Sequence, residues 1–203
     1  MIRIVIAEDQ KLLRGTLSAL LSMEDDIEVV AEAEDGQAAW DAIEQYEPSV
    51  CLLDIEIPYL SGLEIAEKLR QEGHSSKIII VTTFARPGFL QKAMELKVDG
   101  YLLKDEPIDF LIHSIRKVMA GERVISTDLA AVLFLKEDNP LTERETAVLR
   151  LSRLGLSTRE IAKQLFLTDG TVRNYLSIAI QKLGVETRQQ ATEKAYERGW
   201  ISS

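Results

Sequence analysis

Charged and hydroxyl side chains stand at the ends of several short apolar segments in the first half of the chain. Glu8-Asp9 follows one such segment, and Asp54 ends another. If these segments are parallel strands of one sheet, their carboxyl ends meet at one edge, where such sheets bind ligands. Three clustered carboxylates repel one another, so the pattern predicts a hard cation such as Mg2+ among them, bound by few protein oxygens and several waters.

The same residues could carry phosphoryl chemistry. A carboxylate beside a cation can attack a phosphoryl group, because the cation offsets the repulsion between acid and phosphate, and Asp54 is the candidate nucleophile. Two further apolar segments end in Thr82 and Lys104, whose hydroxyl and ammonium groups could contact the phosphoryl oxygens. Each residue alone would usually be solvated or cap a strand. Their occurrence together at successive strand ends favours one site.

The segments that must position these residues alternate with helical patterns over residues 1–121. Near-continuous apolar strands between helices indicate a doubly wound α/β domain, in which a five-stranded parallel sheet is covered on both faces. The expected strands are Ile2–Ala7, Ile27–Ala33, Val50–Leu53, Ile78–Thr82 and Tyr101–Leu103.

A second domain, all-α, is expected over residues 139–203, after a linker over 122–138 in which Leu129–Leu135 forms a short helix. Three of its helices should begin with a capping box, in which an N-cap hydroxyl and an acid or amide three residues later satisfy the first amides. The pairs are Thr142 with Glu145, Ser157 with Glu160, and Thr187 with Gln190, and a fourth helix starts at Thr168. Gly155 and Gly184 suit helix ends that need a positive φ. Four short helices are too few for a large enzyme pocket.

Charge is distributed unevenly along the chain. Residues 1–125 carry 13 Lys and Arg against 23 Asp and Glu, a net charge of −10, whereas residues 140–203 carry 10 against 7, a net charge of +3. The acidic half would repel DNA and the tail could attract it, although +3 does not by itself establish nucleic-acid binding. No run of about 18 apolar residues could span a bilayer and no signal peptide is visible, so we expect a cytoplasmic protein without a membrane partner. The single cysteine, Cys51, lies in an apolar run and should be buried.

The first domain resembles the receiver domains of bacterial response regulators. The resemblance rests on Pro58 and Gly62 in the loop after Asp54 and on five residues at the strand ends, which are Glu8, Asp9, Asp54, Thr82 and Lys104. It implies that Asp54 accepts a phosphoryl group and that Thr82 and Lys104 bind the phosphoryl oxygens. It also implies a Mg2+ site made by Glu8, Asp9, Asp54 and the backbone carbonyl of Glu56.

Two positions add detail to this resemblance. Tyr101 falls at the family's switch aromatic, which turns inward when Thr82 moves toward the phosphate, although packing on the fifth strand would explain an aromatic there equally well. Many receivers have Pro directly after the Lys, whereas Asp105 follows Lys104 here. This departure bears on the local backbone and not on the assignment of the Lys.

The tail from Leu141 to Val185 resembles the helix-turn-helix output domain of the NarL/FixJ (LuxR-type) regulators. The resemblance implies a scaffold helix over Ser157–Leu165 and a recognition helix over Thr168–Leu183 in the major groove of double-stranded DNA. The residues it assigns to base contacts are Arg173, Asn174 and Ser177, and those it assigns to phosphates are Thr171 and Lys182. Apolar residues at helical spacing should form the core: Ile161, Leu165, Val172, Leu176, Ile180 and Leu183.

A recognition helix alone contacts few base pairs, so such tails bind DNA as dimers. Phosphorylation, by a sensor histidine kinase in this family, must therefore create or expose a dimer surface. Leu12 lies off the apolar stripe of the expected helix Gln10–Ser22, and Phe110 lies off that of Ile108–Met119. We hypothesise a receiver homodimer through these first and fifth helices, although local capping contacts could equally occupy both residues.

Two other functions remain open from the sequence. A haloacid-dehalogenase-like phosphatase also uses a strand-end Asp nucleophile, but that family has a second Asp where Glu56 stands, and it would not explain the tail. A receiver that works as an unphosphorylated interaction module would not need the acids, Thr82 and Lys104. The stretch Thr82–Gly88 and the general run of both domains are also similar to Gram-positive regulators of membrane-lipid desaturation, although the sequence identifies neither operator, target genes nor kinase.

Overall fold

The computed structural model describes residues 1–83, 86–132 and 139–201. Contacts divide the chain into two compact units, one made of residues 1–85 and 90–135 and the other of residues 86–89 and 136–203. The last three residues of the expected helix Leu129–Leu135 lie outside the described residues, as do Phe84 and Ala85 in the Thr82–Gly88 stretch. None of the described helices is long and apolar enough to cross a membrane.

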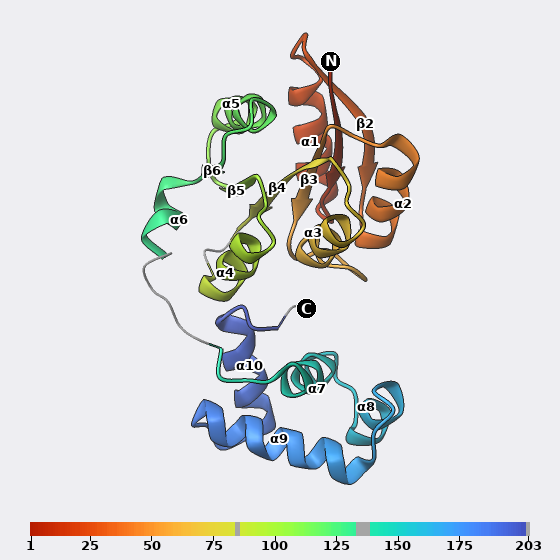
Figure 1. Cartoon of the computed structure of the whole chain (residues 1–203), viewed down its shortest axis with the longest axis vertical. Coiled ribbons are helices and arrows are strands. Elements are labelled where there is room, and N and C mark those ends of the chain that lie inside the picture. The colour runs from red at the N-terminus through yellow and green to blue at the C-terminus, as the bar shows by residue number, and fades with distance from the viewer. Residues whose placement is uncertain (84–85, 133–138, 202–203) are drawn as a thin grey trace. The chain divides into compact units, whose positions relative to one another are not determined.

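The first unit is a parallel sheet with the strand order β2-β1-β3-β4-β5-β6 (Figure 1). Its strands are β1 (Ile2–Ala7), β2 (Ile27–Ala33), β3 (Val50–Asp54), β4 (Lys77–Thr82), β5 (Gly100–Leu103) and β6 (Val124–Ile125). The five expected strands are confirmed to within a residue at each end. The expected total was wrong, because β6 pairs with β5 as a sixth strand inside the predicted linker. Two residues are too short to show a strand pattern in the sequence.

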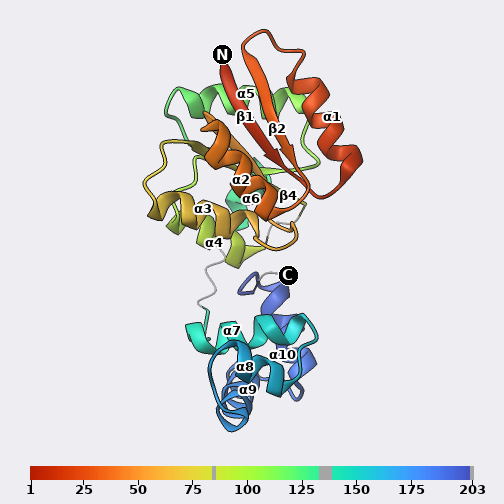
Figure 2. The same cartoon turned by 90° about the vertical axis from the view of Figure 1, so that its right-hand side faces the viewer.

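Helices cover both faces of this sheet. They are α1 (Lys11–Leu21), α2 (Gly36–Tyr46), α3 (Gly62–Gln71), α4 (Pro87–Glu95), α5 (Ile108–Met119) and α6 (Thr127–Val132). Helix α1 packs beside α5, and α2 packs beside α3 on the other side of β1 (Figures 1 and 2). All five residues of β3 are buried, which is why the central strands read as continuous apolar runs rather than alternating ones.

The second unit contains α7 (Glu143–Arg153), α8 (Thr158–Gln164), α9 (Asp169–Leu183) and α10 (Arg188–Glu197). Each begins one residue after an expected N-cap, and all three predicted capping boxes form. Gly155 and Gly184 have φ angles of 78° and 63°, in the left-handed region that favours glycine at a helix end. The predicted core is also confirmed, since Ile161, Val172, Leu176 and Leu183 are buried while Leu165 and Ile180 pack against them.

Gly62 and Gly15 form a matched pair for testing how the sheet edge is packed. A Cβ on Gly62 would overlap the carbonyl oxygen of Asp54 and lie 3.2 Å from the Leu53 Cβ, whereas a Cβ on Gly15, within α1, would meet nothing within 4 Å. We predict that Gly62→Ala lowers the free energy of unfolding by about 1–3 kcal/mol through overpacking. Gly15→Ala should raise it by about 0.5–1 kcal/mol, because alanine favours a helix interior. Urea unfolding of both variants measures this, and equal effects would contradict the packing described.

Candidate phosphorylation site and DNA-binding surface

The sheet register brings the predicted polar residues to one edge. Ala7 of β1 is paired with Leu53 of β3, and Thr82 of β4 is paired with Leu103 of β5. Glu8 and Lys104 follow Ala7 and Leu103 directly, and Asp54 is the last residue of β3. The residues that the sequence predicted at separate strand ends therefore lie at the same edge of neighbouring strands.

Three carboxylates form a cluster at this edge. Oxygen atoms of Glu8, Asp9 and Asp54 all lie within 4.8 Å of one another. Glu8 is 2% exposed and Asp54 is 5% exposed, whereas Asp9 faces solvent. An all-oxygen set that is open to water on the Asp9 side suits a hard cation that keeps several water ligands.

Lys104 joins the two buried acids. Its Nζ lies 2.8 Å from Oε2 of Glu8 and 2.9 Å from Oδ2 of Asp54, and its side chain is almost as buried as theirs. The remaining oxygen of Asp54, Oδ1, accepts a hydrogen bond from the Glu56 amide at 3.3 Å. One ammonium thus faces two buried carboxylates in a site of low dielectric constant, where charge interactions are strong.

Burial has the largest effect on the pKa values of the two buried acids, and Lys104 does not offset it for either acid. Burial raises the pKa of Asp54 above its ordinary value, and the opposing hydrogen bond from Lys104 does not reverse the shift. Burial likewise raises the pKa of Glu8, and the neighbouring Asp54 adds to the effect. Burial would lower the pKa of Lys104, but its hydrogen bonds to Glu8 and Asp54 raise it. Both acids would be stabilised in their charged form by a further cation.

Thr82 lies at the same edge of the sheet as this cluster, and Tyr101 lies further back along β5. Thr82 is buried at the end of β4, where its neighbour across the ladder is Leu103, the residue before Lys104. Tyr101 is fully buried on β5, which agrees both with simple packing on that strand and with the inward position of a switch aromatic.

Arg14 on α1 is a contributor that the sequence did not reveal. Its Nη1 donates to the backbone oxygen of Glu8 at 2.6 Å, and its guanidinium also lies 3.9 Å from Glu32 and 3.6 Å from Glu34. The arginine therefore ties the acidic loop after β1 to the end of β2. An arginine six residues after an acid in an exposed helix carries no recognisable motif, so only the fold could identify it.

The exposed face of α9 carries the predicted base contacts. Arg173, Asn174 and Ser177 are exposed, while Val172 and Leu176 on the same helix are buried. This alternation follows from helical periodicity, which turns one face to the core and leaves the other free. Thr171 is half-buried, and its hydroxyl lies 2.9 Å from that of the N-cap residue Thr168.

Lys182 lies in a different environment from the one expected of a phosphate contact. Its Nζ lies 2.8 Å and 3.1 Å from the two carboxylate oxygens of Glu145, whose side chain is 4% exposed. Glu145 also closes the capping box of α7 by accepting the Thr142 amide at 2.8 Å. Burial would raise the pKa of Glu145, but Lys182 and the Thr142 amide together lower it. The ammonium thus already has a carboxylate partner that fastens α9 to α7.

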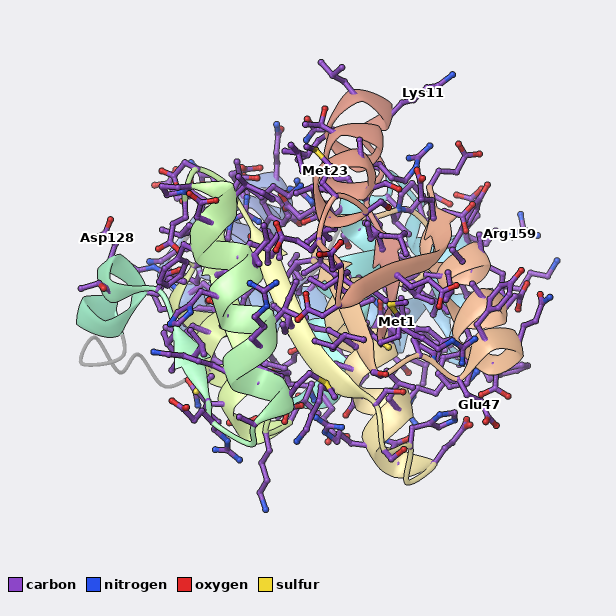
Figure 3. All side chains as sticks on the ribbon, turned by 90° about the horizontal axis from the view of Figure 1, so that it is seen from above. Met1, Lys11, Met23, Glu47, Asp128 and Arg159 are labelled. Atoms are coloured by element: carbon purple, nitrogen blue, oxygen red, sulfur yellow. The ribbon has the colours of Figure 1, made fainter. Side chains whose placement is uncertain are left out.

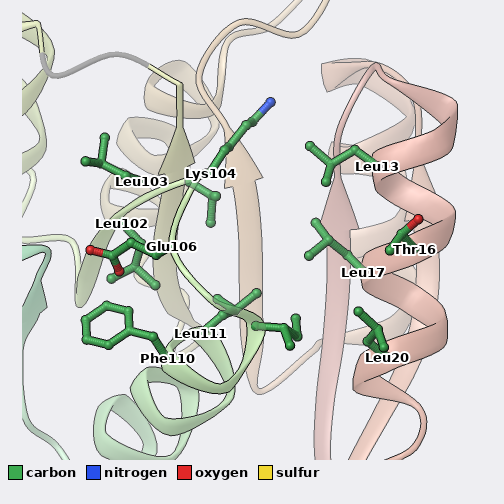
Figure 4. Close-up of a pocket in the computed structure, with 12 residues that line it drawn as sticks. Leu13, Thr16, Leu17, Leu20, Leu102, Leu103, Lys104, Glu106, Phe110 and Leu111 are labelled. Atoms are coloured by element: carbon green, nitrogen blue, oxygen red, sulfur yellow. The ribbon is translucent and has the colours of Figure 1, made fainter.

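Leu12 and Phe110 are placed differently on the face formed by α1 and α5. Leu12 is 85% exposed. Phe110 is half-buried, packs against the core and lines a pocket of about 180 Å3 between the two helices, together with Leu13 and Leu17 (Figure 4). Leu12 is therefore free on the surface, whereas Phe110 is not the freely exposed residue that its position off the apolar stripe suggested.

A doubly wound domain with an acid and lysine site, followed by a helix-turn-helix unit, defines a two-domain transcriptional regulator. Residues 4–116 match the response regulator receiver domain, and residues 139–195 match the bacterial regulatory proteins of the luxR family. The chain belongs to the response regulators of the NarL/FixJ (LuxR-type) family.

Relatives and solved structures agree over the whole chain. The transcriptional regulatory protein DesR of Bacillus subtilis is 49% identical over 201 residues, which cover 99% of this chain and 100% of DesR. The nitrate/nitrite response regulator protein NarL of Escherichia coli is 32% identical over 198 residues, 93% of this chain and 92% of NarL. The response regulator ChrA of a heme-sensing two-component system is 31% identical, covers 98% of both chains and has a TM-score of 0.57. An RcsB–DNA complex is 25% identical with a TM-score of 0.64, over 97% of this chain and 98% of RcsB.

The pairing of Lys182 with Glu145 predicts a stability defect. Lys182→Met should lower the free energy of unfolding by about 1–3 kcal/mol at pH 7, because the Glu145 carboxylate stays buried without its cation. The double variant with Glu145→Gln should recover most of the loss, since the amide can still cap α7. The lowered pKa of Glu145 means that the wild type has this stability above the ordinary value of 4.5 and loses it as the pH falls through the folded-state pKa.

Urea unfolding of the wild type and both variants between pH 3 and pH 7 measures this dependence. The Lys182→Met curve should be flatter over that range. If Lys182→Met unfolds like the wild type and is impaired only in DNA binding, Lys182 is a phosphate contact and not a structural partner of Glu145.

Proposed function

We propose that a sensor histidine kinase phosphorylates Asp54, and that the phosphorylated chain dimerises and binds specific DNA sequences through α9 to control transcription. The observation that carries this proposal is the buried cluster of Glu8, Asp54 and Lys104 at the carboxyl edge of the sheet. Burying these charges contributes little net stability, because the desolvation cost offsets much of their attraction, so a functional role explains the cluster better than a structural one. DNA as the target implies that the chain works in the cytoplasm.

The transfer step follows from the position of Asp54. A carboxylate oxygen of Asp54 forms the new P–O bond while the P–N bond of the kinase phosphohistidine breaks, and the histidine nitrogen leaves with the electron pair of that bond. Mg2+ would be held by Glu8, Asp9, Asp54 and the backbone carbonyl of Glu56, and when bound it supplies the positive charge that offsets the phosphoryl oxygens. Three carboxylates lie beside one ammonium at this edge, and burial raises the pKa values of Glu8 and Asp54, so a further cation would stabilise the charged form of both acids.

Lys104 and Thr82 respond to the new group. Lys104 Nζ lies 2.9 Å from Oδ2 of Asp54, so its ammonium can exchange a carboxylate for the oxygens of a phosphoryl group on Asp54 with little movement. The Thr82 hydroxyl is the donor on the neighbouring strand, and Tyr101 lies two pairs down the adjacent strand. A change at Thr82 is thereby transmitted to β5 and to the α1–α5 face.

The chain is a regulator and not an enzyme that acts on a separate substrate. Its receiver would catalyse its own phosphorylation and slow hydrolysis. The phosphatase alternative leaves α9 unexplained. A receiver that works without phosphorylation remains the competing account of the same two domains, and it is separated from the proposal by the following experiment.

Acetyl phosphate, as a small-molecule donor, tests the site directly. We expect the intact mass of the wild type to increase by one phosphoryl group in the presence of Mg2+, to stay unchanged when Mg2+ is chelated, and to stay unchanged in Asp54→Ala. Asn at position 54 provides a second control that keeps the size of the side chain. Absence of phosphorylation in a folded wild type would favour the unphosphorylated module, and phosphorylation of Asp54→Ala would assign the site elsewhere.

The dimer hypothesis rests on the α1–α5 face. After phosphorylation, the wild type should elute as a dimer in size-exclusion chromatography, whereas Leu12→Asp and Phe110→Asp should stay monomeric because a charge is buried in an apolar contact. Phe110 also packs against the receiver core, so urea unfolding must first show that Phe110→Asp is folded. Leu154→Asp is a matched control, since Leu154 is 57% exposed in the other unit. Unchanged dimerisation of both receiver variants would remove this face from the proposal.

The loss of a base contact and the loss of a phosphate contact change DNA binding in different ways. Arg173→Ala should cost about 1–3 kcal/mol against the preferred sequence and should relax the choice of base at one position. It should leave binding to unrelated DNA nearly unchanged at the same salt concentration. A uniform loss across all sequences would instead place Arg173 on a phosphate. Fluorescence anisotropy with selected and scrambled duplexes distinguishes the two.

A further inference from the structure

A second group of metal-ligating side chains lies on the receiver, away from Asp54. It consists of Glu44 near the end of α2, Glu72 at the end of α3, and His74 in the turn before β4. One ligand atom of each residue lies within 4.8 Å of the others. No motif connects them, because Glu44 is 30 residues from His74 and each alone resembles an ordinary surface residue.

The geometry of this group is close to that of a metal site. The Nε2 of His74 lies 3.1 Å from Oε1 of Glu44 and 3.8 Å from Oε2 of Glu72. For a tetrahedral ion with bonds of about 2.0–2.1 Å, donor atoms are separated by roughly 3.3 Å, so small rotations of the two glutamates would complete three corners. The imidazole ring is held in place from its edge by Trp40, with a centroid distance of 5.9 Å and an interplanar angle of 69°.

A hydrogen bond from His74 explains the position of only one of the two glutamates. The Nε2 atom carries one hydrogen and can donate it to Glu44, which leaves Glu72 at 3.8 Å without that hydrogen bond. The carboxylates of Glu44, on α2, and Glu72, at the end of α3, thus both lie near the Nε2 atom of His74. A divalent cation would bind all three groups at once and would leave a fourth position for water.

We propose that Glu44, Glu72 and His74 bind a divalent transition-metal ion of the Zn2+ class. One imidazole with two carboxylates is a ligand set for borderline ions such as Zn2+, Ni2+ or Cu2+, whereas the oxygen cluster around Asp54 suits Mg2+. The two sites lie at opposite edges of the sheet, because Glu44 and His74 precede β3 and β4 while Asp54 and Thr82 end them. Figure 3 shows the molecule from the side on which β1 begins, where Met1 marks the start of that strand and Glu47 the residue that follows α2.

Bound metal would join α2 to the turn between α3 and β4. These two segments are linked by no covalent cross-link, and the ion would add a contact that only the folded receiver can make. Metal binding should therefore stabilise the receiver without occupying the phosphorylation site. Ion availability would set the stability of the receiver independently of Asp54.

The chain contains only two histidines, which makes the test direct. Zn2+ is titrated into the full chain in the presence of excess Mg2+, and the ring proton resonances of both histidines are followed by NMR. We expect saturable shifts for His74 and none for His113, which is exposed on α5. Shifts of neither ring, or equal shifts of both, would overturn the proposal.

Variants identify the other two ligands. Zn2+ affinity, measured by calorimetry with Mg2+ present, should fall about tenfold or more in Glu44→Gln and Glu72→Gln, and saturable binding should be lost in His74→Ala. His113→Ala is the matched control and should bind like the wild type. Thermal unfolding without Zn2+ checks that each variant is folded. Affinity that is unchanged in His74→Ala would place the ion elsewhere and overturn the assignment.

Discussion

The contact of Lys104 with Glu8 and Asp54 is the interaction on which the receiver depends. Two buried carboxylates and one buried ammonium are stable only when their positions are fixed, and the ends of β1, β3 and β5 in one sheet fix them. Three further features support that placement: the strand register, the close packing of Gly62 against β3, and the hydrogen bond from Arg14 to the backbone oxygen of Glu8. Because the cluster is short of positive charge, a cation and a phosphoryl group can both change its balance, which is what a switch requires.

The DNA-binding unit also contains a lysine paired with a buried carboxylate, but here the pair connects two helices. Glu145 is buried, caps α7 and pairs with Lys182, so the recognition helix is attached to the domain near its own end. Arg173 and Asn174 are exposed on the face of α9 opposite its buried residues and make no internal contact among those described. A rigid helix loses little entropy when it enters a DNA groove, and its side chains can then discriminate between bases.

Much of this architecture could be predicted from the sequence because it is encoded locally. Buried strands read as apolar runs, capping boxes mark the first residue of α7, α8 and α10, and strand-end acids converge in any parallel sheet. What was missed depends on distant residues. The strand β6 is two residues long, Arg14 acts through a backbone oxygen, and the partner of Lys182 lies 37 residues away. Phe110 was expected to be exposed from helical periodicity, which does not report the pocket that it lines.

The most direct test of the account is the affinity of the full chain for DNA before and after phosphorylation. The duplex is first selected from a random library with the phosphorylated protein, and binding is then measured at one fixed salt concentration with Mg2+. We predict that acetyl phosphate raises the affinity of the wild type by roughly a hundredfold, as expected when single sites become paired, and leaves Asp54→Asn unchanged. Equal affinity of the phosphorylated and unphosphorylated wild type would contradict the claim that Asp54 controls α9.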